Sequence, residues 1–391
     1  MVVIARISAR FRAIALLGLC CIAVPGFSDA KDQRSLISTL DALIPASLAQ
    51  HSTPGVAVAV VENGKIILTR GYGFSDVSAR KPMTDRTLVN IASVSKLVSS
   101  WGVMRLVQDQ QLDLDAPIVS IIQGWSFPQT SFDANQVTAR RLLSHTAGIN
   151  MPSVPWFPLA ASPPSLEQVL NGTSSSQPLR LVATPGSSWA YSGGGYTLLQ
   201  LAVDEITGLR IDAFMSRFIF KPLGMKFATF SPSPDSPQLA KLYDEKGKAV
   251  GPFRFIGESA GGLYASASDL APLLAEYQKA ASGRSRVISR NTFAEMVTPV
   301  TKVTFKDNNG KSVDTGDAED GLGHFVHRTR DGRVLLFHSG GNPGALAYFI
   351  VEPTGGNGLF AVVNSDNGGP VLIDILAAWA ASRQVDLPVL F

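Results

Sequence analysis

Ser93 and Lys96 lie three residues apart in the segment Asn90–Val98, and on a helix this spacing places both side chains on one face. A serine hydroxyl is a poor nucleophile at neutral pH and needs a proton acceptor within hydrogen-bond reach. A lysine amine can accept that proton when burial or a nearby cation lowers its pKa. The pair therefore predicts nucleophilic catalysis by a serine. The alternative is an N-capping serine followed by a solvated lysine.

The same Ser-x-x-Lys spacing also follows Ser28 and Ser78, so the spacing alone is not specific. The Ser28 pair straddles a predicted cleavage site. The Ser78 pair ends at Lys81, and the following Pro82 disfavours a helical conformation of that lysine. After Ser93, apolar residues recur at helical intervals. They are Val94, Leu97, Val98, Trp101, Met104 and Val107. Ser93 is therefore predicted in the first turn of a buried helix, where free amides and the helix dipole favour an oxyanion.

A second candidate is Tyr191, which lies in the glycine-rich segment Pro185–Tyr196 before a predicted helix. A phenol held near Lys96 could shuttle the serine proton, since an ammonium would favour phenolate character. The alternative is an aromatic anchor beneath a loop.

A third candidate is the run His338, Ser339, Gly340, Gly341, Asn342, which ends a predicted strand. Glycines there allow a substrate to approach the backbone closely. An amide from the Gly340–Gly341 region could complete an oxyanion hole with the amide of Ser93. The alternative is an ordinary glycine turn between two strands.

A competing motif is Gly257-Glu258-Ser259-Ala260-Gly261, which matches the Gly-x-Ser-x-Gly nucleophile elbow of α/β-hydrolases and has His338 downstream. The elbow needs a strand before it, a helix after it and repeated βαβ units around it. Phe253–Ile256 supplies a strand, but the helical middle and antiparallel end of the chain do not supply the rest. Ser259 is therefore the second choice for a nucleophile.

Several elements are predicted to position these residues. An amphipathic helix over 32–50 precedes two strands, 55–61 and 65–72, joined by Asn63-Gly64, a strong hairpin pattern. Helices are predicted over 138–144, 196–207 and 373–382, and β-rich runs over 324–328, 333–338, 346–351 and 359–364. The Pro/Ser-rich stretch 151–185 has little periodicity and is either a substrate-facing rim or a variable insertion.

Strands at both ends with helices between them predict an α/β fold, in which an antiparallel sheet flanked by helices carries an inserted, mostly helical lobe. We place the α/β lobe at about 31–96 and 262–391 and the helical lobe at about 97–261. The active site is expected in the cleft between the two lobes.

The first thirty residues are predicted to be a signal peptide. Arg6, Arg10 and Arg12 precede an apolar run, and Ser28-Asp29-Ala30 forms a small-residue cleavage site. The run is too short to span a bilayer, and no comparable run follows, so we expect an exported protein, periplasmic or secreted, without a transmembrane segment. Both cysteines, Cys20 and Cys21, lie inside this segment, and lipid anchoring is the less favoured alternative.

Charge and histidine spacing exclude some partners. Beyond residue 30 the chain carries 31 basic and 30 acidic residues, which gives no electrostatic footprint for nucleic acid. The histidines other than His338 show no metal-binding spacing, and His145 is expected to buttress the nucleophile helix. We therefore predict no cofactor and no metal, and a small-molecule substrate. The oligomeric state is left open.

Four further motifs accompany Ser93-Val94-Ser95-Lys96 in the same chain. They are Leu142 to Gly148 (LLSHTAG), Pro185 to Ser192 (PGSSWAYS), Lys221 to Met225 (KPLGM) and Gly261 to Leu270 (GGLYASASDL). Over roughly residues 50–385 the chain resembles the class C β-lactamase-related serine hydrolases. That family includes class C β-lactamases, D-alanyl-D-alanine carboxypeptidases, D-aminopeptidases and β-lactamase-like carboxylesterases, and its fold is that of serine β-lactamases and penicillin-binding proteins.

The resemblance implies that Ser93 is the acylated nucleophile and Lys96 its base partner, while Tyr191 opens the Tyr-x-Asn motif. Two departures stand out: Gly193 replaces the asparagine of that motif, and His338 replaces the lysine of Lys-Thr-Gly. The implied substrate is an ester, amide or β-lactam-like molecule, with a carboxylesterase preference favoured. The alternatives are a β-lactamase or D-amino-acid peptidase, and an acyltransferase or non-catalytic peptidoglycan-binding protein.

Overall fold

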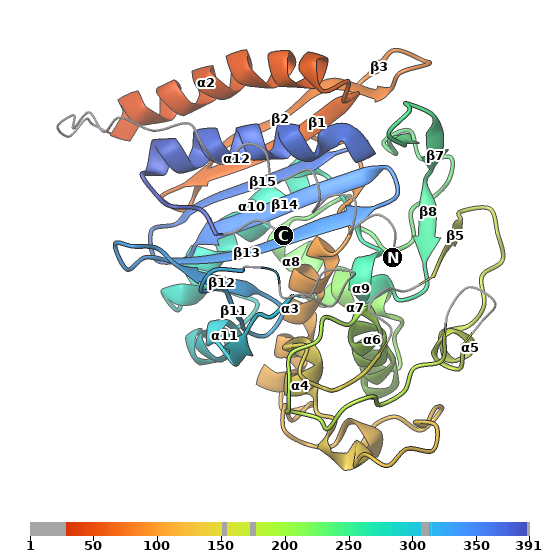
Figure 1. Cartoon of the computed structure of the whole chain (residues 1–391). Coiled ribbons are helices and arrows are strands. Elements are labelled where there is room, and N and C mark those ends of the chain that lie inside the picture. Colours follow the sequence, from red (N-terminus) through yellow and green to blue (C-terminus); the bar gives the residue numbers. More distant parts are fainter. Residues whose placement is uncertain (1–28, 151–154, 173–176, 306–312, 314, 389–391) are drawn as a thin grey trace.

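The computed structural model describes residues 29–150, 155–172, 177–305, 313 and 315–388 (Figure 1). Its centre is a nine-stranded sheet in the order β10-β11-β12-β13-β14-β15-β1-β2-β3, and all its pairings are antiparallel. The strands are β1 (Gly55–Glu62), β2 (Lys65–Asp76), β3 (Lys81–Pro82), β10 (Thr301–Lys302), β11 (Glu319–Asp320), β12 (Phe325–Arg328), β13 (Val334–Asn342), β14 (Ala345–Glu352) and β15 (Asn357–Val363).

The sheet joins the two ends of the chain. β1 and β2 form a hairpin through Asn63 and Gly64, both with positive φ, so the Asn-Gly prediction is confirmed. β12 to β15 follow one another as an antiparallel meander. β15 then pairs with β1, and Val58 lies opposite Ala361. The predicted α/β fold with a flanked antiparallel sheet is confirmed.

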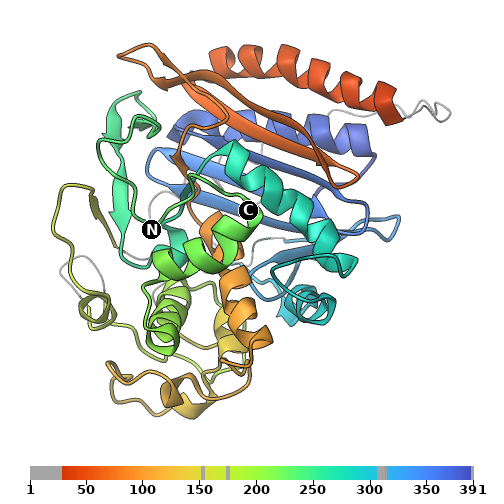
Figure 2. The same ribbon diagram turned by 180° about the vertical axis from the view of Figure 1, so that it is seen from behind.

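Helices cover both faces of this sheet (Figures 1 and 2). The larger helices are α2 (Asp29–Gln50), α3 (Val94–Gln108), α6 (Gly193–Thr207), α10 (Ala267–Ala281), α11 (Arg290–Val297) and α12 (Gly369–Arg383). Successive side chains of a strand point to opposite faces. Val56 and Val58 of β1 therefore pack in one apolar cluster with α2 and α12, whereas Ala57 and Ala59 pack in another with α3 and α10.

Short helices and two-stranded sheets lie beside the main sheet, and most of them come between α3 and α10 in the chain. The helices are α4 (Ala139–Leu143), α5 (Leu166–Leu170), α7 (Ile211–Met215), α8 (Lys221–Leu223) and α9 (Glu258–Gly261), with 3-10 turns at Ile118–Ser120, Ala134–Gln136 and Asp366–Gly368 and a π-helix at Ser216–Phe220. The strands pair as β4 (Val89–Asn90) with β9 (Tyr264–Ala265), β5 (Trp156–Pro158) with β8 (Phe253–Phe255), and β6 (Leu242–Tyr243) with β7 (Ala249–Gly251).

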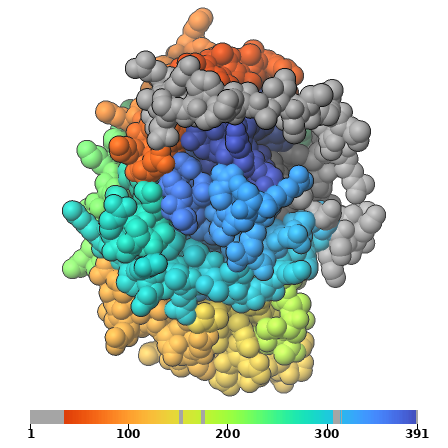
Figure 3. Space-filling view, turned by 90° about the vertical axis from the view of Figure 1, so that its left-hand side faces the viewer, coloured from red at the N-terminus to blue at the C-terminus, as the bar shows by residue number. Residues whose placement is uncertain are grey.

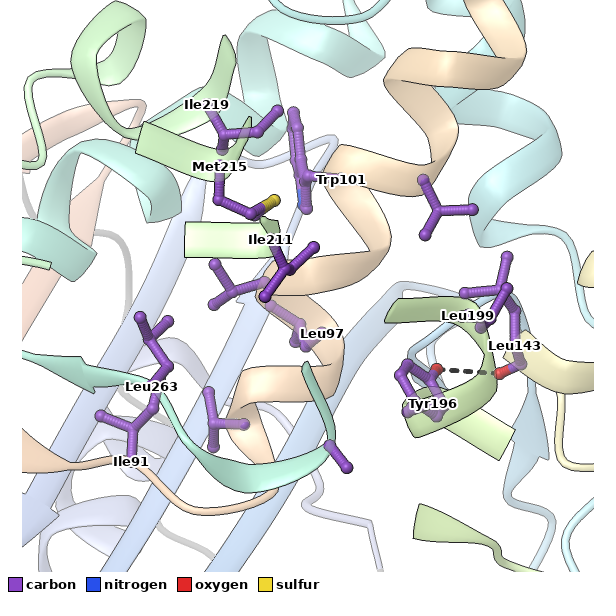
Figure 4. Close-up of a cluster of buried hydrophobic side chains, with 14 of the residues drawn as sticks. Ile91, Leu97, Trp101, Leu143, Tyr196, Leu199, Ile211, Met215, Ile219 and Leu263 are labelled. Carbon is purple, nitrogen blue, oxygen red and sulfur yellow. Dashed lines mark hydrogen bonds between the residues drawn. The ribbon is translucent and has the colours of Figure 1, made fainter. Parts of the chain in front are cut away.

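Helix α3 runs through the larger apolar cluster, as Figure 4 shows around Leu97 and Trp101. The indole of Trp101 donates to the hydroxyl of Tyr277 at 3.1 Å. A methyl group added at Gly102 would lie 2.3 Å from the sulfur of Met215, so glycine permits the close approach of α7. The helix that begins after Ser93 is therefore held on several sides by the core.

The structure differs from the sequence predictions at two boundaries. Helix α6 begins at Gly193, three residues before the predicted start, because the hydroxyl of Ser192 accepts the amide of Gly195 as an N-cap. β13 continues to Asn342, so Gly340 and Gly341 lie within a strand and the interpretation as a glycine turn is wrong.

Some predictions remain untested. Residues 1–28, which include Ser28 and nearly all of the predicted signal peptide, lie outside the described residues. The same holds for 151–154 and 173–176 of the proline-rich stretch. The division into two lobes also remains a prediction. In Figure 3 the segment of about 100–190 forms the lower part of the surface, and the C-terminal strands lie above it. Across the described part of the chain, no helix has the length and apolar character needed to cross a membrane.

Candidate active site

The turn before α3 presents Ser93. The side-chain oxygen of Asn90 accepts the amide of Ala92 at 3.0 Å, and Ala92 adopts a left-handed φ of 48°. This conformation costs a non-glycine residue on the order of 1–3 kcal/mol, so the surrounding contacts must impose it. Ser93 is the N-cap residue of α3, yet its hydroxyl makes no capping hydrogen bond. The hydroxyl is therefore not used to cap the helix, and that alternative interpretation is wrong.

Lys96 lies one helical turn further on and is 2% exposed. Its Nζ contacts the hydroxyl of Ser93 at 3.2 Å and donates to the carbonyl of Ala260 on α9 at 2.5 Å. Burial lowers its pKa to about 7, because a low-dielectric surrounding disfavours the ammonium. Near neutral pH, a substantial fraction of Lys96 is therefore a free amine next to a serine hydroxyl.

Tyr191 lies next to Lys96, with its ring centroid 4.8 Å from Nζ. Burial raises the pKa of Tyr191 above its ordinary value, and hydrogen bonding with the side chain of Ser93 acts in the opposite direction. The raised pKa opposes the phenolate character that a charged Lys96 would favour. Lys96 is buried and Tyr191 is partly buried, and desolvation of the two groups favours a neutral amine and a neutral phenol over an ion pair.

The loop that carries Tyr191 is fixed by His145. The carbonyl of His145 accepts the amide of Ala190 at 2.8 Å, and its Nδ1 accepts the amide of Ser192 at 3.1 Å. Burial lowers the pKa of His145, which agrees with a neutral ring whose Nδ1 is an acceptor. The ring centroids of His145 and Tyr191 are 4.3 Å apart. His145 therefore supports the loop of Tyr191, and its support of the nucleophile helix stays a prediction.

The end of β13 lies against the nucleophile turn. β12 pairs with Val334–Phe337 of β13, and the strand then runs past the end of β12. A methyl group added at Gly340 would lie 2.7 Å from the amide nitrogen of Ser93 and 2.7 Å from the carbonyl of Ile91. Glycine is therefore needed at 340 because two backbones meet there. Ser339 and Gly341 are partly exposed beside the same turn.

By the resemblance of the motifs, His338 stands where a cationic lysine is expected. It is 3% exposed, and its ring lies 4.9 Å from Phe325 and 6.3 Å from Tyr191. Burial lowers its pKa to about 3, and the nearby charge of Lys96 acts in the same direction. This corner of the site is therefore aromatic and uncharged at neutral pH.

Two asparagines also hold the site together. The sequence motifs include both of them but indicate no role for their side chains. The amide of Asn342 at the end of β13 donates to Oδ1 of Asn90 at 2.6 Å and to the carbonyl of Gly261 at 3.0 Å. The amide of Asn90 also donates to Gly261, at 3.2 Å. These bonds join the strand, the nucleophile turn and α9. No spacing in the sequence marks them, because the three segments are far apart along the chain.

The competing serines do not form comparable sites. Ser259 is 2% exposed, and its hydroxyl donates to the carbonyl of Tyr196 at 2.6 Å. It lies on the four-residue helix α9 after β8, which pairs with β5 in a two-stranded sheet. The nucleophile-elbow interpretation is therefore wrong. Ser78 donates to the carboxylate of Asp76 and lies between β2 and β3 rather than on a helix. In the described residues, no group of three or more His, Cys, Asp or Glu is placed to hold a metal ion.

Comparisons with known proteins agree with this geometry. The family described as Beta-lactamase matches residues 40–382, so the chain belongs to the beta-lactamase family and the resemblance found in the motifs is confirmed. Esterase EstB of Burkholderia gladioli is 29% identical over 212 residues, which cover 51% of this chain and 53% of EstB. A D-aminopeptidase of Brucella canis is 28% identical over 200 residues, 50% of this chain and 36% of that enzyme.

A solved structure shows the same fold. The octameric penicillin-binding protein homologue from Pyrococcus abyssi superposes with a TM-score of 0.72 at 23% identity, over 89% of this chain and 77% of that one. The chain spans about half the length of EstB and less of the D-aminopeptidase. Family and fold are therefore established by the comparisons.

The contact of Gly340 with the nucleophile turn gives a first prediction. We expect Gly340→Ala to slow labelling of Ser93 by a fluorophosphonate probe by roughly a hundredfold, because the added methyl group displaces a backbone within the site. Gly124→Ala is the control, since its methyl group would make only an ordinary contact, at 3.5 Å with the carboxylate of Glu205, and should cost less than about tenfold. Equal labelling of both variants, with unchanged circular dichroism, would contradict the role given to Gly340.

The lowered pKa of Lys96 gives a second prediction. If the free amine accepts the proton of Ser93, acylation should be slow below pH 6 and rise to a plateau above pH 8, with an apparent pKa of about 7. The rate should be followed by intact mass with a probe that carries no titrating group in this range. A rate that is flat from pH 5 to 9, or one that falls as pH rises, would show that Lys96 is not the group that titrates.

Proposed function

We propose that this protein is a serine hydrolase that works through an acyl-enzyme on Ser93 and prefers neutral esters. The observation that carries the proposal is the buried amine of Lys96, 3.2 Å from the hydroxyl of Ser93 and with a pKa lowered to about 7. A buried lysine that serves only stability would be better replaced by an apolar side chain. Membership of the beta-lactamase family and similarity to an esterase support the same class of reaction.

In the proposed mechanism the hydroxyl of Ser93 attacks the substrate carbonyl while its proton passes to Lys96, directly or through the phenol of Tyr191. The amides of Ser93 and Gly341 hold the oxyanion of the tetrahedral intermediate. Collapse of the intermediate breaks the bond to the leaving group, which takes the proton from Lys96 or Tyr191. A water molecule then attacks the acyl-enzyme by the same route, releases the acid and regenerates Ser93.

Two features favour esters over β-lactams and peptides. A β-lactam or peptide presents an acylamino group and a carboxylate, which are best met by a side-chain amide and a fixed cation. Here Gly193 supplies no side-chain amide, and His338 is a buried, neutral ring. Each lost polar partner costs roughly 1–3 kcal/mol in a desolvated site, or about ten- to a hundredfold in rate. An ester needs only the nucleophile and the oxyanion hole, so its rate of hydrolysis should fall less than that of a β-lactam or a peptide.

The assignment of the nucleophile is tested by a serine-directed probe and peptide mapping. We expect label on Ser93, and we expect Ser93→Ala to lose ester hydrolysis by at least about a thousandfold. Ser259→Ala is the matched control and should keep its activity, because its hydroxyl bonds to the backbone. Label on Ser259, or full activity in Ser93→Ala, would overturn the assignment. Stoichiometric acylation without turnover would favour a binding protein. Transfer of the acyl group to added alcohols or amines would favour an acyltransferase.

Substrate preference is tested by comparing kcat/KM for a short-chain nitrophenyl ester and a chromogenic cephalosporin. We expect the ester to be the better substrate, and we expect Gly193→Asn to move the ratio towards the cephalosporin by about tenfold because it restores one amide. A preference for the cephalosporin in the natural sequence would contradict the proposal. An unchanged ratio in Gly193→Asn would show that Gly193 is not the cause.

A further inference from the structure

A buried hydrogen bond links the loop of Tyr191 to the main sheet. The indole Nε1 of Trp189 donates to Oδ2 of Asp320 at 2.7 Å, and the two residues are 7% and 1% exposed. Trp189 lies two residues before Tyr191, and Asp320 lies on β11, between β10 and β12. The bond therefore connects two segments that are 131 residues apart in sequence.

An aspartate at position 320 lowers the stability of the fold unless its carboxyl group is hydrogen-bonded. Burial of a carboxyl group is unfavourable in either ionisation state unless hydrogen bonds compensate. Burial raises the pKa of Asp320 well above its ordinary value, and the bond from Trp189 acts in the opposite direction. Negative charge on Asp320 would also raise the pKa of Tyr191, so the two groups are electrostatically connected. A structural contact alone would be met more cheaply by an apolar pair.

The geometry places Tyr191 between two anchors. On one side, the amides of Ala190 and Ser192 bind His145. On the other side, Trp189 binds Asp320 of the sheet and packs edge-on against Phe305, with ring centroids 4.7 Å apart. The loop that carries the phenol is thus tied to β11 of the sheet and to the segment of His145. Proton transfer at Ser93 needs this accuracy, since a shift of about 1 Å can cost a hundredfold.

We propose that Asp320 is a positioning residue. By accepting a hydrogen bond from the indole N–H of Trp189, it holds Tyr191 in position relative to Ser93 and Lys96. The inference rests on the proposed function, because it gives Tyr191 a part in proton transfer. Asp320 acts as a hydrogen-bond acceptor in this arrangement, and its charge is not required. An asparagine of the same shape should therefore replace it, whereas leucine should not.

The experiment compares Asp320→Asn, Asp320→Leu, Trp189→Phe and the Asp320→Leu/Trp189→Phe double variant. Trp125→Phe is the matched control, because the indole of Trp125 is 7% exposed and makes a similar bond, at 2.9 Å, to Asn171. For each protein we would measure the rate of Ser93 labelling by a fluorophosphonate, kcat and KM for a nitrophenyl ester, their pH profiles, and Tm.

We expect Asp320→Leu and Trp189→Phe each to lower the labelling rate and kcat by about ten- to a hundredfold, with KM within about threefold. The double variant should be no slower than the slower single variant, because both changes remove one bond. Asp320→Asn should retain the rate within about threefold and keep the pH profile, and Trp125→Phe should do the same.

Four results would overturn the inference. They are near-normal rates in Asp320→Leu and Trp189→Phe, additive losses in the double variant, failure of Asp320→Asn to retain the rate in a folded protein, and an equal loss in Trp125→Phe. Failure of the proposed function is seen separately in the natural sequence, as labelling of Ser93 without ester turnover. The labelling rates of the variants still test the position of Tyr191 in that case. Absence of Ser93 labelling in the natural sequence would overturn both proposals.

Discussion

The structure depends on keeping the amine of Lys96 out of water beside the hydroxyl of Ser93. Helix α3 carries both residues and is enclosed by the core over most of its length, which is why the amine is desolvated. The carbonyl of Ala260 and the rings of Tyr191 and Tyr196 surround it in place of solvent. Desolvation lowers the pKa of the amine, and a lysine that would be a permanent cation on the surface becomes a base that can work near neutral pH.

This arrangement requires three segments that are distant in sequence to pack in close contact. They are the nucleophile turn, the end of β13 and helix α9. The nucleophile turn holds Ala92 in a left-handed conformation, and β13 comes so close to it that position 340 must be glycine. Asn342 and Asn90 join the strand to the turn through side-chain hydrogen bonds. Short-range backbone contacts and a buried polar network are both rigid, so the strain of the turn is balanced by contacts made elsewhere.

Membership of the beta-lactamase family does not by itself determine what is hydrolysed. The elements around Ser93 are those of the family fold, but the groups that would recognise a charged substrate differ. His338 is buried among aromatic rings and neutral, and Gly193 opens α6 without a side-chain amide. Binding specificity lies in such matched polar contacts, and a site that lacks them selects mainly by shape and apolar contact. The fold and the substrate preference are therefore separate questions in this protein.

The sequence by itself predicted most of the elements and indicated the type of chemistry that we propose. Periodicity, the Asn-Gly turn and the Ser93–Lys96 spacing are local patterns, and local patterns suffice to place the hairpin, the meander and the nucleophile helix. Only the tertiary structure decided the start of α6 at Gly193, the strand conformation of Gly340, the neutral state of Tyr191 and His338, and the bond between Trp189 and Asp320. Ionisation depends on burial, and such contacts depend on which distant segments pack together. Neither the ionisation state of a side chain nor its contacts with distant segments can be inferred from the spacing of neighbouring residues.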